Sequence, residues 1–475
     1  MTDVRRLPDL LAEGAIAPLV VDVVGDPSGV LVADVEHDSR RPVDGSIFCC
    51  VPGARHDGHD HARGAVEAGA VALLVERRLE VDAVQIVVPS VRRAMGEIAA
   101  AVHGHPSRRL RLIGITGTNG KTTTTTLLAS VLEYAGARCA TIGTLDGGFT
   151  TPEATDLQRR LARLVDDGFT SVVMEVSSHA LEFARVAGCE FDLAIFTNLS
   201  RDHLDLHGTM ERYFAVKAQL FTAGYARRGL ANLDDTHGRL LVDAAPIPMS
   251  GFGSGDISDI VVRPTVHEYT WREHRVVVPM GGDYNVSNSL AVATASVMLG
   301  IEVEVVIEAL AVAPAVPGRF EPVRAGQAFD VIVDYAHTPD GLRGVLGSVR
   351  SAMRSGRTIV VFGCGGDRDR EKRPMMGEAA AELADIVVVT SDNPRSERSE
   401  DIIDAIVGGV PDDYRQRVLI EPDRRRAIEL AFSLAGAGDV VVLAGKGHET
   451  TQTFADRVVP FDDRLVAREV LEAQR

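Results

Sequence analysis

Short apolar runs alternate with stretches whose apolar residues recur at helical spacing, and this alternation continues along most of the chain. Short apolar runs are typical of buried strands, whereas apolar residues at positions i, i+3, i+4 and i+7 indicate helices. The pattern therefore predicts an α/β protein. In its first part, the predicted strands are Val30–Val35, Ile47–Val51, Ala70–Val75 and Val84–Val88, and the predicted helices are Ala62–Ala68 and Val91–His103.

Two turn-rich segments, His103–Arg109 and Ala313–Gly318, interrupt this alternation. Their prolines and glycines are typical of linkers. We therefore expect a small N-terminal α/β domain at residues 1–107, a central domain at 108–315 and a C-terminal domain at 316–475. In the C-terminal domain, strands alternate with helices as in a Rossmann-like, doubly wound parallel sheet; the predicted strands are Asp330–Asp334, Thr358–Phe362, Ile386–Thr390 and Val440–Leu443.

The central domain opens with a glycine-rich turn, Gly114–Thr123, between a predicted strand and a helix. Backbone N–H groups and the helix dipole would bind a phosphate there, Lys121 would reach the outer phosphates, and Thr122 would ligate Mg²⁺. The standard P-loop fingerprint requires glycine at position 115, which is Ile115. The turn is therefore either a false match or a variant of the loop. If it is a variant, the central domain is a P-loop ATPase-like parallel sheet, with Ser171–Val176 and Leu193–Thr197 as further strands.

Composition limits the classes of function. A net charge of −17 over 475 residues argues against nucleic-acid or membrane-surface partners. No apolar run approaches the roughly 18 residues that a membrane span needs, and the N-terminus shows no secretory signal. The five cysteines form no C-x-x-C pair, which indicates free thiols in a reducing compartment. We expect a cytoplasmic protein without membrane insertion.

Lysine is rare: only four of the 50 basic residues are lysines, namely Lys121, Lys217, Lys372 and Lys446. Arginine replaces lysine wherever any cation serves, so the survivors are candidates for positions that need a compact, titratable amine. Lys217 lies between Tyr213 and Phe221 at i, i+4 spacing on a predicted helix. Desolvation there would lower its pKa, and a neutral amine can form a carbamate that ligates Mg²⁺. The alternative is a lysine that extends its amine to solvent.

Two further polar features accompany the loop. The apolar strand Val172–Glu175 ends in a carboxylate, which beside a phosphate loop favours a role in holding Mg²⁺ or orienting water. The segment Arg201–His207 is rich in Asp and His. We favour Mg²⁺ over zinc there, because thiol partners are absent and a nucleotide requires oxygen ligands. A polar loop without function is the alternative.

Four predicted strands of the C-terminal domain end in polar turns: Asp334–Asp340, Gly363–Asp369, Thr390–Arg395 and Ala444–Glu449. In a parallel sheet these ends share one edge, where ligands bind. Arg368 and Arg395 suit carboxylates, whereas Asp392 and Glu449 suit ammonium groups. The four turns therefore predict a site for a zwitterionic amino acid.

Three other polar clusters have simple interpretations. Three histidines between positions 56 and 61 suggest a metal, but we interpret Asp57 or Asp60 as the cap of the helix near Ala62. Ser39 with Arg40 would bind an anion. The consecutive arginines 424–426 are interpreted as a solvated helix face.

These ordered motifs together resemble the Mur ligases, the ATP-dependent amino-acid ligases of peptidoglycan precursor synthesis. Their phosphate loop has the form T-G-T-N-G-K-[ST], which Thr116–Thr122 match, so Ile115 agrees with the family's own variant. Within the family, the chain resembles the MurE type. The matching stretches cover nearly the whole chain: Asp38–Arg40, Thr150–Pro152, Met174–Leu181, Asn198–Asp205, Tyr284–Asn288, Gly318–Glu321, Asp334–Asp340, Gly363–Pro374, Asp392–Arg395 and Gly445–Glu449.

The resemblance implies a role for each matching residue. Those implied to bind ATP are Gly117, Thr118, Asn119, Gly120, Lys121, Thr122, Thr123, Asn288, Arg319, Asp334 and His337. Two Mg²⁺ ions would be held by Thr122, Glu175, His203 and carbamylated Lys217. The UDP-sugar-dipeptide would be bound by Ser39, Thr150, Thr151, Ser177 and Arg185, and the incoming amino acid by Arg368, Asp392, Asn393, Pro394, Arg395, Gly445 and Glu449. The implied catalytic residues are Lys121, Glu175, His203, Lys217 and Asp334.

The implied activity is the addition of meso-2,6-diaminopimelate to the D-glutamyl side chain of UDP-N-acetylmuramoyl-L-alanyl-D-glutamate, through an acyl phosphate and with ATP as co-substrate. In family members the sequence Asp-Asn-Pro-Arg accompanies diaminopimelate, and lysine-adding relatives lack the arginine that Arg395 matches. A lysine-adding ligase, a folylpolyglutamate-synthetase-like ligase and a nucleotide-binding regulatory protein without turnover are the alternatives. We expect a monomer.

Overall fold

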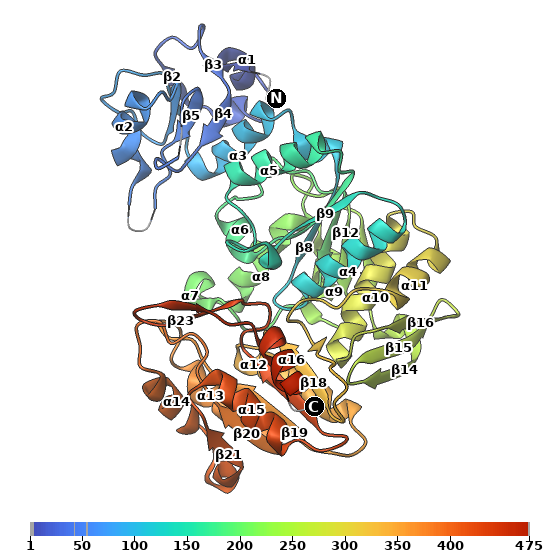
Figure 1. Cartoon of the computed structure of the whole chain (residues 1–475). Helices are drawn as coiled ribbons and strands as arrows, with labels where there is room; N and C mark the ends of the chain where they lie inside the picture. Colours follow the sequence, from blue (N-terminus) through green and yellow to red (C-terminus); the bar gives the residue numbers. More distant parts are fainter. Residues whose placement is uncertain (1–3, 42, 54–55, 474–475) are drawn as a thin grey trace. The chain divides into compact units, whose positions relative to one another are not determined.

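The computed structural model describes residues 4–41, 43–53 and 56–473 (Figure 1). The chain divides into two units. One contains the chain up to Phe252 together with Thr294–Leu299, and the other contains Gly253–Ala293 and the chain from Gly300 onward. The domain boundaries expected at residues 107 and 315 stay predictions. Among the described residues, no helix is both long enough and apolar enough to cross a lipid bilayer.

The first unit begins with a five-stranded sheet of order β2-β7-β6-β5-β4. Only β2 is antiparallel to its neighbour. Alternate residues of β5 and β6 point to opposite faces, where α1 and α3 cover one apolar cluster and α2 covers the other. The predicted strands and helices are present, although Val30–Val35 divides into β3 and β4. The bounds are β1 Arg5–Arg6, α1 Leu7–Leu11, β2 Asp22–Val24, β3 Leu31–Val32, β4 Asp34–Glu36, β5 Ser46–Cys49, α2 Ala62–Glu67, β6 Ala72–Val75, β7 Gln85–Val87 and α3 Val91–Val102.

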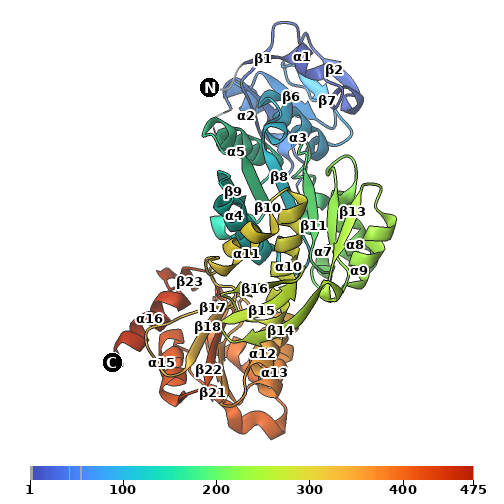
Figure 2. The same cartoon turned by 90° about the vertical axis from the view of Figure 1, so that its right-hand side faces the viewer.

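The same unit continues into a six-stranded sheet of order β13-β12-β11-β8-β10-β9, in which every pair is parallel. Strand β8 lies between β10 and β11, so the chain leaves it at the point where the strand order reverses, which is where parallel sheets bind ligands. The parallel sheet predicted for the central part is confirmed (Figure 2). The bounds are β8 Arg111–Thr116, α4 Lys121–Tyr134, β9 Cys139–Ile142, α5 Ala154–Asp166, β10 Ser171–Glu175, α6 Ser178–Glu182, β11 Leu193–Phe196, α7 Leu204–His207, α8 Met210–Ala218, β12 Gly229–Asn232, α9 Thr236–Ala244 and β13 Met249–Phe252.

The second unit opens with an antiparallel sheet of order β14-β15-β16 that the sequence pattern did not predict. Helix α11 packs against β16. Strand β14 is largely exposed, so it lacks the continuous apolar run that marks the parallel strands. The bounds are β14 Ile257–Arg263, β15 Val266–Trp271, β16 His274–Val278, α10 Asp283–Met298 and α11 Val303–Ala311.

The C-terminal sheet has the order β17-β18-β22-β19-β20-β21, and all its strands except β17 are parallel. Helices α12, α13 and α14 cover one face and α15 and α16 cover the other, each over its own apolar cluster. The doubly wound prediction is therefore confirmed. The bounds are β17 Glu321–Pro322, β18 Asp330–Asp334, α12 Pro339–Ala352, β19 Thr358–Phe362, α13 Lys372–Leu383, β20 Ile386–Val389, α14 Ser399–Val407, β21 Val418–Ile420, α15 Arg424–Leu434, β22 Val440–Ala444, β23 Thr451–Thr453, β24 Val458–Pro460 and α16 Asp463–Ala473.

The interpretation of arginines 424–426 as a solvated face is wrong for Arg424. This residue begins α15 and its side chain is completely buried. Its guanidinium forms a two-pronged ion pair with Asp463, at 2.8 and 2.7 Å, and donates to the carbonyl oxygen of Ala444 at 2.9 Å. A buried charge requires such a partner. The partner lies 39 residues away in the chain, so the local pattern did not reveal it.

We predict that Asp463→Asn destabilises the protein by about 3–5 kcal/mol, because it leaves the Arg424 guanidinium buried without its counter-charge. The urea concentration at half-unfolding measures the loss. The matched control is Glu469→Gln, which removes one partner of Arg425 on the same two helices, where both side chains are about half exposed. That change should cost less than about 1 kcal/mol. Equal midpoints for the two variants would contradict the assignment.

Candidate functional site

The glycine-rich turn joins β8 to α4 and has the geometry of an anion site. Gly117 and Gly120 have φ values of 152° and 84°, which favour glycine. A Cβ on Gly117 would lie 1.9 Å from the hydroxyl oxygen of Thr197, so no larger residue fits. Asn198 holds the turn from the neighbouring strand end, since its side-chain oxygen accepts the N–H of Asn119 at 2.9 Å. The turn is thus a preformed loop at the N-terminus of α4.

Two lysines meet at one carbonyl oxygen of this loop. The amine of Lys121 donates to the carbonyls of Gly117 and Thr118 at 2.9 and 2.8 Å, and the amine of Lys217 donates to Gly117 at 2.9 Å. Lys217 is 1% exposed and its amine lies 4.7 Å from the ring centre of Tyr213. Burial, followed by the charge of Lys121, lowers the pKa of Lys217 well below its usual range. The predicted desolvation is confirmed, and the solvent-reaching alternative is wrong.

Glu175 ends β10 directly beside the loop and is 1% exposed. Its carboxylate accepts the hydroxyl of Thr122 at 3.0 Å, the backbone N–H of Thr144 at 2.9 Å and the hydroxyl of Thr144 at 3.3 Å. A hydroxyl and a carboxylate at this separation are oxygen donors of the kind that Mg²⁺ prefers. Among the described residues, no group of three or more His, Cys, Asp or Glu could hold a metal ion alone. Threonine and ligand oxygens would therefore complete any magnesium site here.

His203 precedes α7 with a left-handed backbone, φ 51°. Its ring lies 4.9 Å from the ring of His179, centre to centre, and its side chain is 45% exposed. In the described part of the chain, it forms no hydrogen bond or ion pair with Glu175 or Lys217. Of the four residues implied to hold Mg²⁺, Thr122 is bonded to Glu175, and Lys217 is bonded to the glycine-rich loop. His203 lies apart from them on the accessible turn before α7.

The residues implied for the sugar-peptide gather around Thr151, which is fully buried. Its hydroxyl donates to the carbonyl of Glu175 at 2.9 Å and accepts the N–H of Ser177 at 3.1 Å. Arg185 donates to the carbonyl of Thr151 at 3.2 Å, and the hydroxyl of Thr150 lies 3.1 Å from that of Thr144. Four of the five implied residues are therefore grouped at the end of β10.

The fifth, Ser39, lies exposed in the turn after β4. The guanidinium of its neighbour Arg40 forms two bonds of 2.8 Å with Asp38 and holds the pKa of that carboxyl below its usual range. The predicted anion-binding arginine is therefore already paired. Asp57 accepts the N–H of His59 at 3.0 Å and caps the 3₁₀ turn Gly58–His61. Helix α2 follows this turn without a side-chain cap of its own, so the predicted cap lies one turn before the helix that was expected to carry it.

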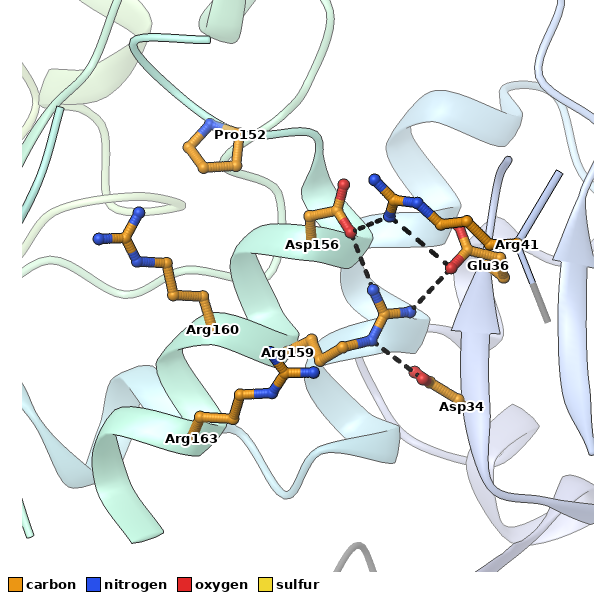
Figure 3. Close-up of a pocket in the computed structure, with 8 residues that line it drawn as sticks. All are labelled: Asp34, Glu36, Arg41, Pro152, Asp156, Arg159, Arg160 and Arg163. Carbon is orange, nitrogen blue, oxygen red and sulfur yellow. Dashed lines mark hydrogen bonds and ion pairs between the residues drawn. The ribbon is translucent and has the colours of Figure 1, made fainter. Parts of the chain in front are cut away.

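An arginine that the sequence analysis missed anchors the Ser39 turn to α5. Arg159 donates to Asp34 at 2.9 Å and to Glu36 at 3.2 Å, and Figure 3 shows it between these strand residues and Asp156 of its own helix. Glu36 in turn accepts the N–H of Asp38 at 3.0 Å. A pocket of about 540 Å³ adjoins this network, lined by Asp34, Glu36, Arg41, Pro152, Asp156, Arg159, Arg160 and Arg163. The partners are over 100 residues apart, which explains the omission.

In the second unit, three of the residues implied to bind ATP meet at the end of β18. Both oxygens of Asp334 accept backbone N–H groups, from Phe320 at 2.7 Å and Ala336 at 2.8 Å, while burial raises the pKa of its carboxyl. The guanidinium of Arg319 lies 4.5 Å from the ring centre of Tyr335, and His337 bonds to the Tyr335 carbonyl at 2.8 Å. Asn288 lies separately on α10, where it donates to Asn285 at 2.9 Å.

The ends of β20 and β22 form a buried charge network. The amide of Asn393 donates to Asp392 at 3.0 Å and to Glu449 at 2.7 Å. The amine of Lys446 is fully buried, 3.3 Å from Glu449 and 3.9 Å from Asp392. Gly445, between the network and β22, has φ 108°, a backbone conformation that favours glycine. Burial raises the pKa of Asp392. The predicted ammonium-binding carboxylates therefore do lie together.

The two arginines expected to bind carboxylates lie on adjacent loops. Arg395 has φ 52° and donates to the carbonyl of Gly366 at 2.7 Å, while Arg368 is exposed. A Cβ on Gly365 would lie 2.9 Å from a guanidinium nitrogen of Arg395. The loops that follow β19 and β20 are thus in direct contact.

Comparison with known proteins assigns this architecture to a family. Three family descriptions match successive parts of the chain: "Mur ligase family, catalytic domain" matches residues 32–105, "Mur ligase middle domain" matches 115–296 and "Mur ligase, glutamate ligase domain" matches 318–447. Together they span most of the sequence, including the loop, the strand ends and the Ser39 turn.

Individual relatives agree along nearly the whole length. A UDP-N-acetylmuramoyl-L-alanyl-D-glutamate–2,6-diaminopimelate ligase of Geobacillus thermodenitrificans is 44% identical, over 94% of this chain and 96% of that protein. A protein of the same name from Solibacter usitatus is 45% identical, over 93% and 94%. A solved structure with this name has 34% identity and a TM-score of 0.69, over 96% of this chain and 97% of that one. The chain therefore belongs to the Mur ligase family.

Proposed function

We propose that this chain is an ATP-dependent ligase that joins meso-2,6-diaminopimelate to the D-glutamyl side-chain carboxylate of UDP-N-acetylmuramoyl-L-alanyl-D-glutamate. The observation that carries the proposal is the strand-end cluster in which Asp392 and Glu449 lie beside the loops of Arg368 and Arg395. Carboxylates for ammonium groups and arginine forks for carboxylates match diaminopimelate. The names of the full-length relatives support the same substrate.

ATP would bind through its phosphates to the loop at the start of α4. The amine of Lys121 already points back into this loop, so it would exchange carbonyl partners for phosphate oxygens and neutralise charge as the γ-phosphate is transferred. Asn288, Arg319, Asp334 and His337 would bind the remainder of the nucleotide, with the Arg319 guanidinium held against the ring of Tyr335 and His337 bonded to the Tyr335 carbonyl.

The donor set fits magnesium. Thr122, Glu175, His203 and carbamylated Lys217 would hold Mg²⁺, which would supply positive charge to the phosphate oxygens. For the carbamate, the neutral amine of Lys217 adds to the carbon of CO₂ and loses a proton. The lowered pKa of Lys217 favours the neutral amine that this addition requires.

The reaction proceeds in two displacements. A carboxylate oxygen of the D-glutamyl group attacks the γ-phosphorus of ATP, and ADP leaves with the electron pair of the broken bond. The diaminopimelate amine then attacks the acyl carbon, phosphate leaves and the amine loses a proton, which gives the amide. Thr151, Ser177 and Arg185 would hold the sugar-peptide while the first step occurs.

Residues that this chain contains argue against each of the three alternative functions. A lysine-adding ligase would not need the arginine fork of Arg395, and a regulatory protein would not need the Lys121, Glu175 and Lys217 group. The N-terminal match to residues 32–105, which includes the Ser39 turn, supports a nucleotide-sugar substrate over a folate. The proposed nucleotide substrates place the reaction in the cytoplasm, and a monomeric state stays a prediction.

We predict rapid ADP release when the protein is given ATP, Mg²⁺, UDP-N-acetylmuramoyl-L-alanyl-D-glutamate and meso-diaminopimelate. Release with L-lysine in its place should be slower by about a hundredfold or more, because lysine lacks the second carboxylate and leaves the arginine that would bind it without a partner. A coupled assay for ADP measures both rates. Faster release with lysine would indicate a lysine-adding ligase, equal rates would contradict the preference for diaminopimelate, and no release with diaminopimelate would contradict the proposed activity.

For Lys217, we predict that substitution by alanine lowers kcat by about a hundredfold, because the carbamate oxygens are lost. Acetate or formate at high concentration should restore part of the activity by supplying a carboxylate in the vacated space. The control is Arg212→Ala on the same helix, an exposed residue paired with Glu182, which should retain activity. Absence of rescue would count against the carbamate.

A further inference from the structure

The loops after β19 and β20 leave the sheet side by side, since these strands are parallel neighbours with Phe362 opposite Val389. They carry Arg368 and Arg395, the arginines proposed to bind the carboxylates of the incoming amino acid. Arg368 is exposed and the backbone of Arg395 is in the left-handed region, φ 52°. The Arg395 guanidinium donates to the Gly366 carbonyl of the other loop at 2.7 Å, so the positions of the two guanidiniums depend on how the two loop backbones are held together.

One set of bonds joins the loops through Asp367. Its carboxylate accepts the backbone N–H of Ser396 at 3.1 Å and the Ser396 hydroxyl at 2.6 Å. Next to it, the N–H of Gly366 donates to the carbonyl of Asn393 at 2.8 Å. A Cβ on Gly366 would lie 1.8 Å from the carbonyl oxygen of Pro394. The two backbones are therefore as close as glycine permits.

A second set anchors the joined loops to α13. Glu397 accepts the N–H of Asp367 at 2.7 Å and both prongs of the Arg373 guanidinium, at 2.9 and 3.1 Å. Arg373 is 3% exposed and lies in the first turn of α13. The bond from Arg373 lowers the pKa of Glu397 to about 2, which favours its charged form. The joined loops are thereby tied to helix α13.

We propose that Asp367, Arg373, Ser396 and Glu397, which we call the loop clasp, are positioning residues that set the separation of Arg368 and Arg395. The clasp thereby selects an amino acid that carries two carboxylates. The Asp367 carboxylate is bonded to Ser396, and Glu397 is paired with Arg373, so these side chains act through the two arginines and not on the substrate. This inference rests on the proposed function and adds to it the group of residues that makes the arginine pair selective.

The physical reason is preorganisation. Two guanidiniums at a fixed separation bind two carboxylates of matching separation without losing further conformational freedom. If the loops moved independently, either arginine could pair with a single carboxylate, and the advantage of a second carboxylate would fall. A bidentate arginine–carboxylate pair is strict about geometry, so small displacements matter.

The test uses the full-length protein with Glu397→Gln, which keeps the size of the side chain and removes its charge, and Ser396→Ala, which removes one exposed hydroxyl. For Glu397→Gln we expect KM for meso-diaminopimelate to rise about tenfold or more, while KM for ATP and for the nucleotide-dipeptide changes less than about twofold. For Ser396→Ala we expect a rise of about threefold. The ratio of kcat/KM for diaminopimelate to kcat/KM for L-lysine should fall in both variants, and it should fall further in Glu397→Gln than in Ser396→Ala.

The matched control is Glu400→Gln, the same change at a carboxylate that is 61% exposed at the start of α14, 3.7 Å from Arg398. It should leave every KM unchanged. The proposal is overturned if folded Glu397→Gln keeps the wild-type KM for diaminopimelate, or if all three KM values rise together. A lower thermal midpoint without a change in the diaminopimelate-to-lysine ratio would show a structural role only, and it also overturns the proposal.

Failure of the clasp and failure of the proposed function give different results. Wild-type protein that releases no ADP with diaminopimelate contradicts the function itself. If the wild-type protein does release ADP with diaminopimelate but the clasp variants keep the wild-type selectivity, only the clasp proposal is contradicted. If Glu397→Gln does not fold, Ser396→Ala decides, because its side chain is exposed and its loss leaves the Arg373–Glu397 pair intact.

Discussion

Charged groups buried at the carboxyl ends of parallel strands must be paired, and this requirement shapes both units of the protein. The ends of parallel strands leave backbone groups and polar side chains at one sheet edge, where ligands bind. At such an edge Glu175 is held by two threonines and Arg424 is held by Asp463. Because an unpaired charge there would cost several kcal/mol, each partner fixes its neighbour's position. The sites are rigid because their charges are satisfied.

The partners of a buried lysine also indicate whether its amine can react or only stabilises the fold. Lys217 shares a carbonyl with Lys121, and burial lowers its pKa, which favours the neutral amine that carbamate formation requires. Lys446 is equally buried, yet it is surrounded by Glu449, Asp392 and the carbonyl of Thr451. The rarity of lysine in the sequence identified both positions. Only their surroundings distinguish a candidate for carbamylation from an internal counter-charge.

The features that sequence could predict are those encoded locally. Apolar runs give the parallel strands because a strand buried on both faces needs continuous apolar residues, and the glycine-rich turn must follow one of them. Four polar turns share an edge for the same topological reason. What the sequence could not predict depends on distant partners: Arg424 with Asp463, Arg159 with Asp34, and Glu397 with Arg373. The half-exposed sheet β14–β16 was missed because its apolar pattern is weak.

The ion pairs and hydrogen bonds that the sequence did not reveal hold in place the motif residues that it did reveal. Arg159 fixes Glu36, which carries the turn of Ser39, and Glu397 fixes Asp367 beside Arg368. A motif therefore specifies which groups meet a substrate, while remote ion pairs specify where those groups lie. Two chains with the same motifs can then differ in selectivity when a supporting pair changes. Since Glu397 lies only two residues beyond Arg395, recognition of diaminopimelate would depend on a longer segment than Asp392–Arg395.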